Sequence, residues 1–217
     1  MENLKSLITF GNTKLPKTTA IFNFGSATNC PSKKLGLCEL SNKCYALKAE
    51  KMYKSCLPFR ERQYKYWKNC TPEQFCNEFT EIYKHKKIKP TLLRFNESGD
   101  FYGLECYYKA EKIAQILKTT LNVTCYAYTH RTDLTYYNNF PFLNLLKSGF
   151  NHNDYLAAKY VAVKKELFEE TKKDIEVFKY NSKVNFPYQK KYICKGSCKT
   201  CNLCATIKAG TIYTKLH

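Results

Sequence analysis

Four cysteines near the C-terminus are the residues of this sequence best suited to chemistry: Cys194, Cys198, Cys201 and Cys204. These four, the tail thiols, lie within eleven residues, separated by three, two and two residues. Neither a strand nor a helix would place all four on one side, so a set of core thiols explains the spacing poorly. Cytosolic cysteines clustered in this way are more often metal ligands than disulfide partners. The tail therefore predicts a metal site.

The spacing of the tail thiols also bears on which metal they hold. Structural zinc sites typically pair two C-x2-C knuckles across a longer loop. Short consecutive runs with gaps of two and three residues are how bacterial ferredoxins bind [4Fe-4S] clusters. We therefore expect an iron–sulfur cluster in the tail. Zinc is the alternative metal, because Cys-only sites suit both.

A second group, the loop thiols Cys30, Cys38 and Cys44, precedes a segment that is predicted to be helical. Its gaps of seven and five residues are irregular, so buried small residues are the alternative interpretation. Three ligands would leave one coordination position open, as catalytic metal sites do, whereas the tail offers a closed set of four. We therefore expect any reaction at the loop thiols. The other five cysteines are expected in the core: Cys56, Cys70, Cys76, Cys106 and Cys125.

Polar residues follow two of the predicted strands. Ser98, Gly99 and Asp100 come after a buried-type strand at 91–95, where α/β folds place their chemistry. A glycine lets a ligand approach the backbone, and the Asp100 carboxylate could hold an ammonium group. A plain turn with a helix cap is the alternative. His130 and Arg131 follow the next strand, either as a solvated loop or as an anion site.

The elements that position these residues alternate along the chain. Strands are predicted at 5–10, 18–24, 91–95, 122–128, 155–163 and 175–178, and helices at 45–50, 59–67, 72–83, 110–117, 140–147 and 164–172. This alternation indicates βαβ units, and hence an α/β fold with a partial (β/α) barrel or an open parallel sheet. We expect this core over residues 1–180 and a Cys-rich C-terminal extension over residues 181–217.

Composition narrows the class of protein. The 217 residues are 44% hydrophobic and 15% aromatic, which excludes a disordered chain. No apolar run approaches the ~20 residues that cross a bilayer, and residues 1–10 lack the apolar segment of a signal peptide. We therefore expect a cytoplasmic protein with no membrane partner.

The net charge of +18, from 36 basic and 18 acidic residues, is typical of nucleic-acid-binding proteins. Metal-bound thiolates would lower it, and a general bias towards Lys also explains part of it. The alternative function is therefore a basic nucleic-acid-binding protein whose metal only stabilises the fold. Residues 84–89 and the Lys-Tyr alternation at 64–68 would contact the nucleic acid, although a solvated helix face explains that alternation equally well.

Several motifs together resemble the phage "gene product 88" family. They are Gly-Asn-Thr-Lys-Leu at 11–15, the loop thiols followed by Tyr45-Ala46, Ser-Gly-Asp-Phe at 98–101, Ala-Tyr-Thr at 127–129, and the tail thiols. The resemblance spans residues 10–204. It implies a phage or prophage origin, the cytoplasm of an infected or lysogenic host, and an iron–sulfur or other metal-binding character.

The layout is also similar to that of a radical S-adenosylmethionine (SAM) enzyme of reduced size. That similarity implies that the loop thiols hold an open [4Fe-4S] cluster and that SAM binds its fourth iron. Ser98, Gly99 and Asp100 would contact SAM in place of a Gly-Gly-Glu-like segment, and the tail thiols would hold an auxiliary cluster. An electron donor, an unidentified substrate and reductive cleavage of SAM are the further implications. The superfamily's x3-x2 spacing occurs at Cys194, Cys198 and Cys201, so a permuted arrangement ranks third, because only 13 residues follow Cys204.

Overall fold

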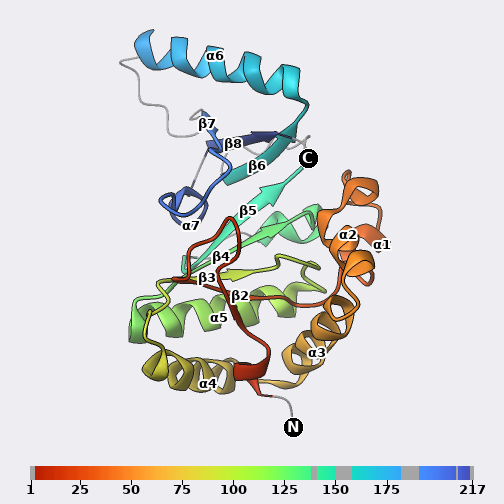
Figure 1. Ribbon diagram of the computed structural model, residues 1–217, viewed down its shortest axis with the longest axis vertical. Helices are drawn as coiled ribbons and strands as arrows, with labels where there is room; N and C mark the ends of the chain where they lie inside the picture. The colour runs from red at the N-terminus through yellow and green to blue at the C-terminus, as the bar shows by residue number, and fades with distance from the viewer. Residues whose placement is uncertain (1–2, 138–140, 150–157, 182–190, 209, 216–217) are drawn as a thin grey trace.

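The computed structural model describes residues 3–137, 141–149, 158–181, 191–208 and 210–215 (Figure 1). In these residues eight strands form one sheet in the order β1-β2-β3-β4-β5-β6-β8-β7. β1 and β2 pair antiparallel, and all the remaining neighbouring strands pair in parallel. The sheet does not close on itself, since β1 and β7 are its edges. The predicted α/β class is confirmed, in its open-sheet form.

The strands are β1 Thr9–Phe10, β2 Thr19–Phe22, β3 Leu92–Phe95, β4 Thr124–Thr129, β5 Leu143–Ser148, β6 Ala158–Val163, β7 Lys191–Ile193 and β8 Gly210–Lys215. The α-helices are α1 Pro31–Lys34, α2 Tyr45–Met52, α3 Cys56–Asn69, α4 Pro72–His85, α5 Leu104–Leu121, α6 Lys165–Asn181 and α7 Leu203–Thr206. Short 3-10 helices are η1 Leu4–Ser6, η2 Ser41–Lys43 and η3 Thr132–Tyr137. None of the helices in the described part of the chain combines the length and low charge of a membrane-spanning segment.

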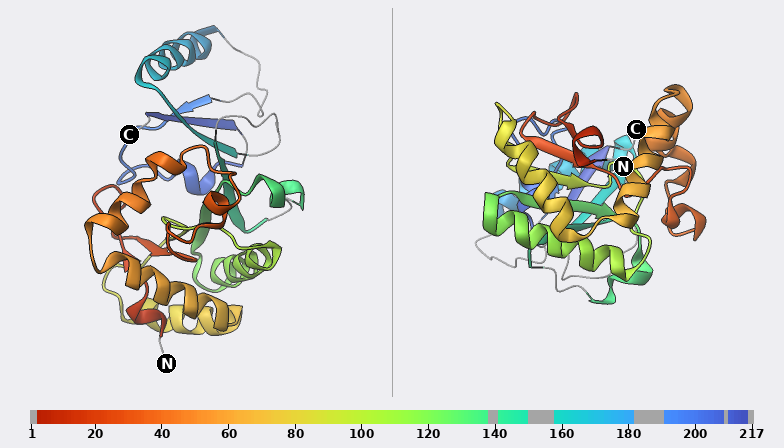
Figure 2. Two further views of the ribbon diagram at one scale, coloured as in Figure 1. Left: turned by 90° about the vertical axis from the view of Figure 1, so that its right-hand side faces the viewer. Right: turned by 90° about the horizontal axis from the view of Figure 1, so that it is seen from below.

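One face of the sheet packs on α3, α4 and α5 (Figures 1 and 2). Phe22 and Phe95 from the strands meet Trp67 of α3 and Phe75 of α4 there, with ring centroids 5.3 Å apart for Phe22 and Phe75. Successive strand residues point to opposite faces, so Arg94, next to Phe95, points to the other side. That other side, the inner face, is covered by residues from the Cys-rich tail, including Ala205 and Ile207.

Two predicted elements are wrong. Residues 140–147 were predicted as a helix from their leucines, but Leu143–Ser148 form β5 between β4 and β6; residue 140 lies outside the described residues. Strands inside a parallel sheet are covered on both faces and carry the same apolar runs as buried helices. The strand expected at 175–178 is instead part of α6, because a helix that has started extends cooperatively through β-branched residues.

The strand predicted at 5–10 shortens to β1, since Leu4–Ser6 form a 3-10 helix capped by the Asn3 side chain. The Cys-rich tail connects β7 to β8, and β8 pairs in parallel with both β6 and β7. The tail is therefore held between two strands of the same sheet. Residues 182–190, at the start of the predicted extension, lie outside the described residues.

Candidate metal centre

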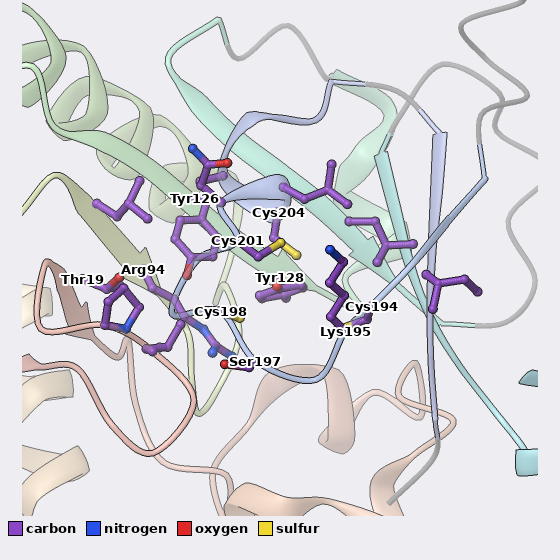
Figure 3. Close-up of a pocket in the computed structure, with 18 residues that line it drawn as sticks. Thr19, Arg94, Tyr126, Tyr128, Cys194, Lys195, Ser197, Cys198, Cys201 and Cys204 are labelled. Atoms are coloured by element: carbon purple, nitrogen blue, oxygen red, sulfur yellow. The ribbon is translucent and has the colours of Figure 1, made fainter. Parts of the chain in front are cut away.

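The four tail thiols line one pocket on the inner face of the sheet (Figure 3). Arg94 of β3 and Tyr126 and Tyr128 of β4 line the same pocket, and Leu15 and Pro16 from the β1–β2 turn contribute to it. Each of the tail thiols is half-buried. The structure thus gathers the predicted tail residues at one site.

Three elements hold the tail in this position. The Cys194 amide donates to the Tyr213 carbonyl of β8 at 2.8 Å. The Cys198 amide donates to the Lys14 carbonyl at 3.0 Å, and the Asn144 side chain of β5 donates to the Cys204 carbonyl at 2.7 Å. The turn at 11–15 is therefore part of the site, because it anchors the middle of the tail.

The tail thiols interact with one another and with nearby donors. The Gly196 amide donates to Cys194 Sγ at 3.4 Å, and the Tyr160 hydroxyl lies 3.9 Å from the same sulfur. Burial raises the pKa of Cys204 to about 11; a hydrogen bond with Tyr128 opposes this and the other three tail thiols add to it. At neutral pH the Cys204 thiol therefore stays protonated unless a cation ionises it, as a bound metal does.

Within the described ranges, no group of three or more His, Cys, Asp or Glu side chains is already arranged to hold a metal ion. The thiols are close neighbours, but their ligand geometry is not preformed. A metal centre here would draw the sulfurs together, as metal sites that couple binding to folding do.

Two buried polar side-chain atoms of this pocket, one in Arg94 and one in Thr19, have no hydrogen-bond partner among the described residues. Arg94 Nε is buried and makes no hydrogen bond with any described residue, and the same holds for Oγ1 of Thr19, which is 0% exposed. Arg94 Nη2 reaches only the Tyr45 hydroxyl at 3.4 Å, and its guanidinium lies 5.0 Å from the Tyr128 ring centroid. No described carboxylate forms a salt bridge with Arg94. Sequence reasoning missed both residues, and the only signal was a charged residue inside a short buried strand.

The loop thiols lie after β2, with Cys30 at the N-cap of α1 and Cys44 at the N-cap of α2. Burial raises the pKa of Cys30 to about 12, with smaller contributions from Asp100 and Cys38. Burial also raises the pKa of Cys38, and Cys44 adds to this. Cys38 thus interacts with both Cys30 and Cys44 in the segment after β2, and none of the loop thiols lines the pocket of the tail thiols.

Glu50 of α2 holds the start of the loop that carries these thiols. Its carboxylate accepts hydrogen bonds from the amides of Ala27 at 2.7 Å and Thr28 at 2.9 Å. The Arg60 guanidinium pairs with it at 2.8 Å, and both side chains are buried. The Ser98 hydroxyl also reaches Glu50 at 3.3 Å, so the loop after β3 joins the same network.

Asp100, predicted to hold an ammonium group, is 2% exposed and accepts four hydrogen bonds. Oδ1 accepts from Thr129 Oγ1 and the Phe101 amide, both at 2.8 Å. Oδ2 accepts from Ser32 Oγ at 2.6 Å and the His130 amide at 2.8 Å. A carboxylate has about four lone-pair sites, so all of them are used. Asp100 thus fastens the loop of α1 to the ends of β3 and β4, and an incoming ammonium would have to displace a donor.

The other two predicted residues of this loop are also engaged. The Ser98 amide donates to Asn23 Oδ1 at 2.8 Å. Gly99 has a φ of +75°, and its backbone lies so close to Gly25 that an added Cβ would meet the Gly25 carbonyl oxygen at 2.8 Å. Arg131, a candidate for an anion site, pairs with Asp133 at 2.8 Å. These residues all belong to the loops that follow the C-terminal ends of β3 and β4.

A family model described as "Gene product 88" matches residues 4–207, and the chain belongs to this phage-type family. The resemblance inferred from the motifs is confirmed. No curated protein and no solved structure matches the chain.

Proposed function

We propose that this member of the gene product 88 family is an iron–sulfur protein, whose tail thiols hold a [4Fe-4S] cluster on the inner face of the sheet. The observation that supports it most is Arg94, a half-buried cation in the pocket that the thiols line; it forms no salt bridge with a described carboxylate, and its buried Nε has no hydrogen-bond partner among the described residues. A buried guanidinium N–H without an acceptor typically costs about 1–3 kcal/mol, so it points to a missing acceptor, and the positive charge favours one that is anionic.

The charge of the cluster supplies that anion. Four thiolates around a [4Fe-4S]²⁺ core carry a net charge of about −2. The guanidinium of Arg94 would offset part of it, and the orphaned Nε and the Thr19 hydroxyl would donate hydrogen bonds to its sulfurs. Zinc with four thiolates has the same charge, but it offers fewer sulfur acceptors and is rarely bound by one short ribbon. Iron is therefore the better fit.

The loop thiols are the second part of the proposal. Cys30, Cys38 and Cys44 would hold a cluster with one open coordination position at the strand ends. Such a cluster supplies one-electron chemistry to a bound substrate or to SAM, with electrons from an external donor. The chain's own contribution is positioning: Glu50 and Asp100 fix the loop between the ends of β2, β3 and β4. The radical SAM reaction itself stays a prediction.

Anaerobic purification followed by absorbance, iron, sulfide and zinc analysis tests the proposal. We expect a brown protein with iron and acid-labile sulfide in equal amounts. Cys198→Ser/Cys201→Ser should remove the tail cluster alone, and Cys38→Ser/Cys44→Ser the loop cluster alone. The matched control is Cys56→Ser, a half-buried thiol at the start of α3 outside both groups. A colourless protein with stoichiometric zinc, or loss of all iron from either double variant, would contradict the arrangement.

A further inference from the structure

The two basic stretches that the sequence suggested for nucleic acid keep their lysines largely exposed, but several of these residues also make contacts within the fold. Lys84 pairs with Glu81 at 2.8 Å, Lys86 lies 3.7 Å from the Phe10 ring centroid, and Lys89 donates to the Tyr83 carbonyl at 2.7 Å. In the second stretch, 64–68, Tyr66 and Trp67 belong to the core. Neither stretch carries a Tyr, Phe or Trp ring that is more than half exposed, so a surface that combines lysines with exposed rings lies elsewhere in the described residues.

The exposed side of α2 and the residues after it form a different basic and aromatic surface. Tyr45, Lys48 and Met52 are spaced as neighbours on one face of the helix, and all three are exposed. Residues 51–55 follow as five consecutive exposed positions. Tyr45 is 58% exposed, and Met52 and Tyr53 are each 59% exposed. We call Tyr45, Lys48 and residues 51–54 the α2 surface; it belongs to a corner of the molecule formed by α1 and α2 (Figure 1).

The charge around the α2 surface is more positive than in the chain as a whole. Residues 31–69 contain ten Lys and Arg against three Asp and Glu, compared with 36 against 18 overall. One acid and one base of this stretch, Glu50 and Arg60, neutralise each other in the interior. The exposed part of the stretch therefore carries a local excess of positive charge, which complements a polyanion.

The two exposed tyrosines decide what kind of polyanion fits. Exposed lysines alone are ordinary on a protein of this composition, but large aromatic side chains that are more than half exposed are not needed for solubility. Aromatic rings beside lysines are what proteins use to bind single-stranded nucleic acid, with bases stacked on the rings and phosphates near the cations. The Tyr45 hydroxyl donates to the Glu97 carbonyl at 2.5 Å, so this ring is positioned before any ligand binds.

We infer that the α2 surface binds single-stranded nucleic acid, with bases on Tyr45 and Tyr53 and phosphates on Lys48, Lys51 and Lys54. The inference does not depend on a bound metal. The surface begins at the residue after Cys44, so a bound strand would lie beside the proposed open cluster.

Fluorescence anisotropy with a labelled oligothymidylate about 20 nucleotides long tests the inference. We expect wild-type protein to bind, with a slope of log K against log salt of about −2 for three phosphate contacts. Tyr53→Ala/Lys54→Ala should weaken binding at least about fivefold and make the slope shallower. The matched control, Tyr108→Ala/Lys112→Ala on the exposed side of α5, removes the same side-chain types and the same charge. It should change affinity less than twofold.

The inference would be overturned by no binding at low salt, by an equal loss in both double variants, or by tighter binding to duplex of the same length. Competition by polyglutamate as effective as that by unlabelled oligonucleotide would do so too, since it would indicate an acidic protein as the partner. Iron content measured on the same samples distinguishes loss of a cluster from loss of nucleic-acid binding. Binding by metal-depleted protein would uphold this inference whatever the outcome for the clusters.

Discussion

Ser32 Oγ donates a 2.6 Å hydrogen bond to the buried Oδ2 of Asp100, across 68 positions of the chain. Ser32 lies in α1 between the first two loop thiols, and Asp100 lies just after β3. The contact therefore sets where the loop thiols sit relative to the strand ends.

Asp100→Asn should destabilise the fold by about 3 kcal/mol. Whichever way the asparagine side chain turns, its NH2 group will face a backbone N–H that needs an acceptor. The donors concerned are the amides of Phe101 and His130. Ser32→Ala is the milder comparison and should cost about 1 kcal/mol, since it removes one bond. Denaturant unfolding measures both. If the two variants had equal free energies of unfolding, the hydrogen bonds of Asp100 to the Phe101 and His130 amides would not be stabilising the fold.

Gly99→Ala should be more harmful than Gly36→Ala. Both glycines have a positive φ, +75° and +69°, so each alanine carries the left-handed backbone cost of about 1 kcal/mol. Only Gly99 also meets backbone atoms, those of Gly25, whereas nothing lies within 4 Å of a Cβ at Gly36. We expect an additional loss of about 1–3 kcal/mol at Gly99 in denaturant unfolding. Similar losses at both positions would mean that the loops after β2 and β3 are not closely packed.

Glu50→Gln should cost about 3 kcal/mol at pH 7, because it leaves the buried Arg60 without its counter-charge. Burial alone would raise the pKa of Glu50, but hydrogen bonds from Ala27, Arg60 and Thr28 lower it overall. With a lowered pKa in the folded state, the stabilisation is complete above the unfolded-state value of about 4.3 and is lost as the pH falls through the folded-state pKa. The difference between wild type and variant, measured by denaturant unfolding at several pH values, should therefore shrink in acid. A difference that stays constant or grows would contradict this assignment.

Thr19→Val should raise the stability of metal-depleted protein and lower the reduction potential of cluster-loaded protein. The buried Thr19 hydroxyl has no hydrogen-bond partner among the described residues, so in metal-depleted protein the isosteric valine should stabilise the fold by about 1 kcal/mol. In cluster-loaded protein the lost hydrogen bond to sulfur should make the reduction potential more negative. Denaturant unfolding and a redox titration measure the two. An unchanged potential would place the Thr19 hydroxyl away from the cluster.

The elements that sequence predicted well are those with local signals. Thr71 accepts a hydrogen bond from the Gln74 amide at 3.0 Å and starts α4 as its capping pattern predicted. β5 was mistaken for a helix because Leu143, Leu145 and Leu146 suit both structures; its position between β4 and β6 decides the outcome.

The same distinction applies to the site. The tail thiols were found from their spacing alone, which is a local property. Thr19 and Arg94 come together only through the parallel register of β2 and β3, where Thr19 is opposite Leu92 and Ile21 is opposite Arg94. Nothing in the sequence near either residue encodes that register, so their place beside the thiols required the tertiary structure.

The most direct test of the central claim is the metal content of Cys30→Ser/Cys38→Ser/Cys44→Ser, in which only the tail thiols remain of the two groups. Purified without oxygen, this variant should hold about four iron and four acid-labile sulfide per chain, with the absorbance of a [4Fe-4S] cluster. A variant with no iron, or with one zinc and no sulfide, would contradict a cluster in the tail.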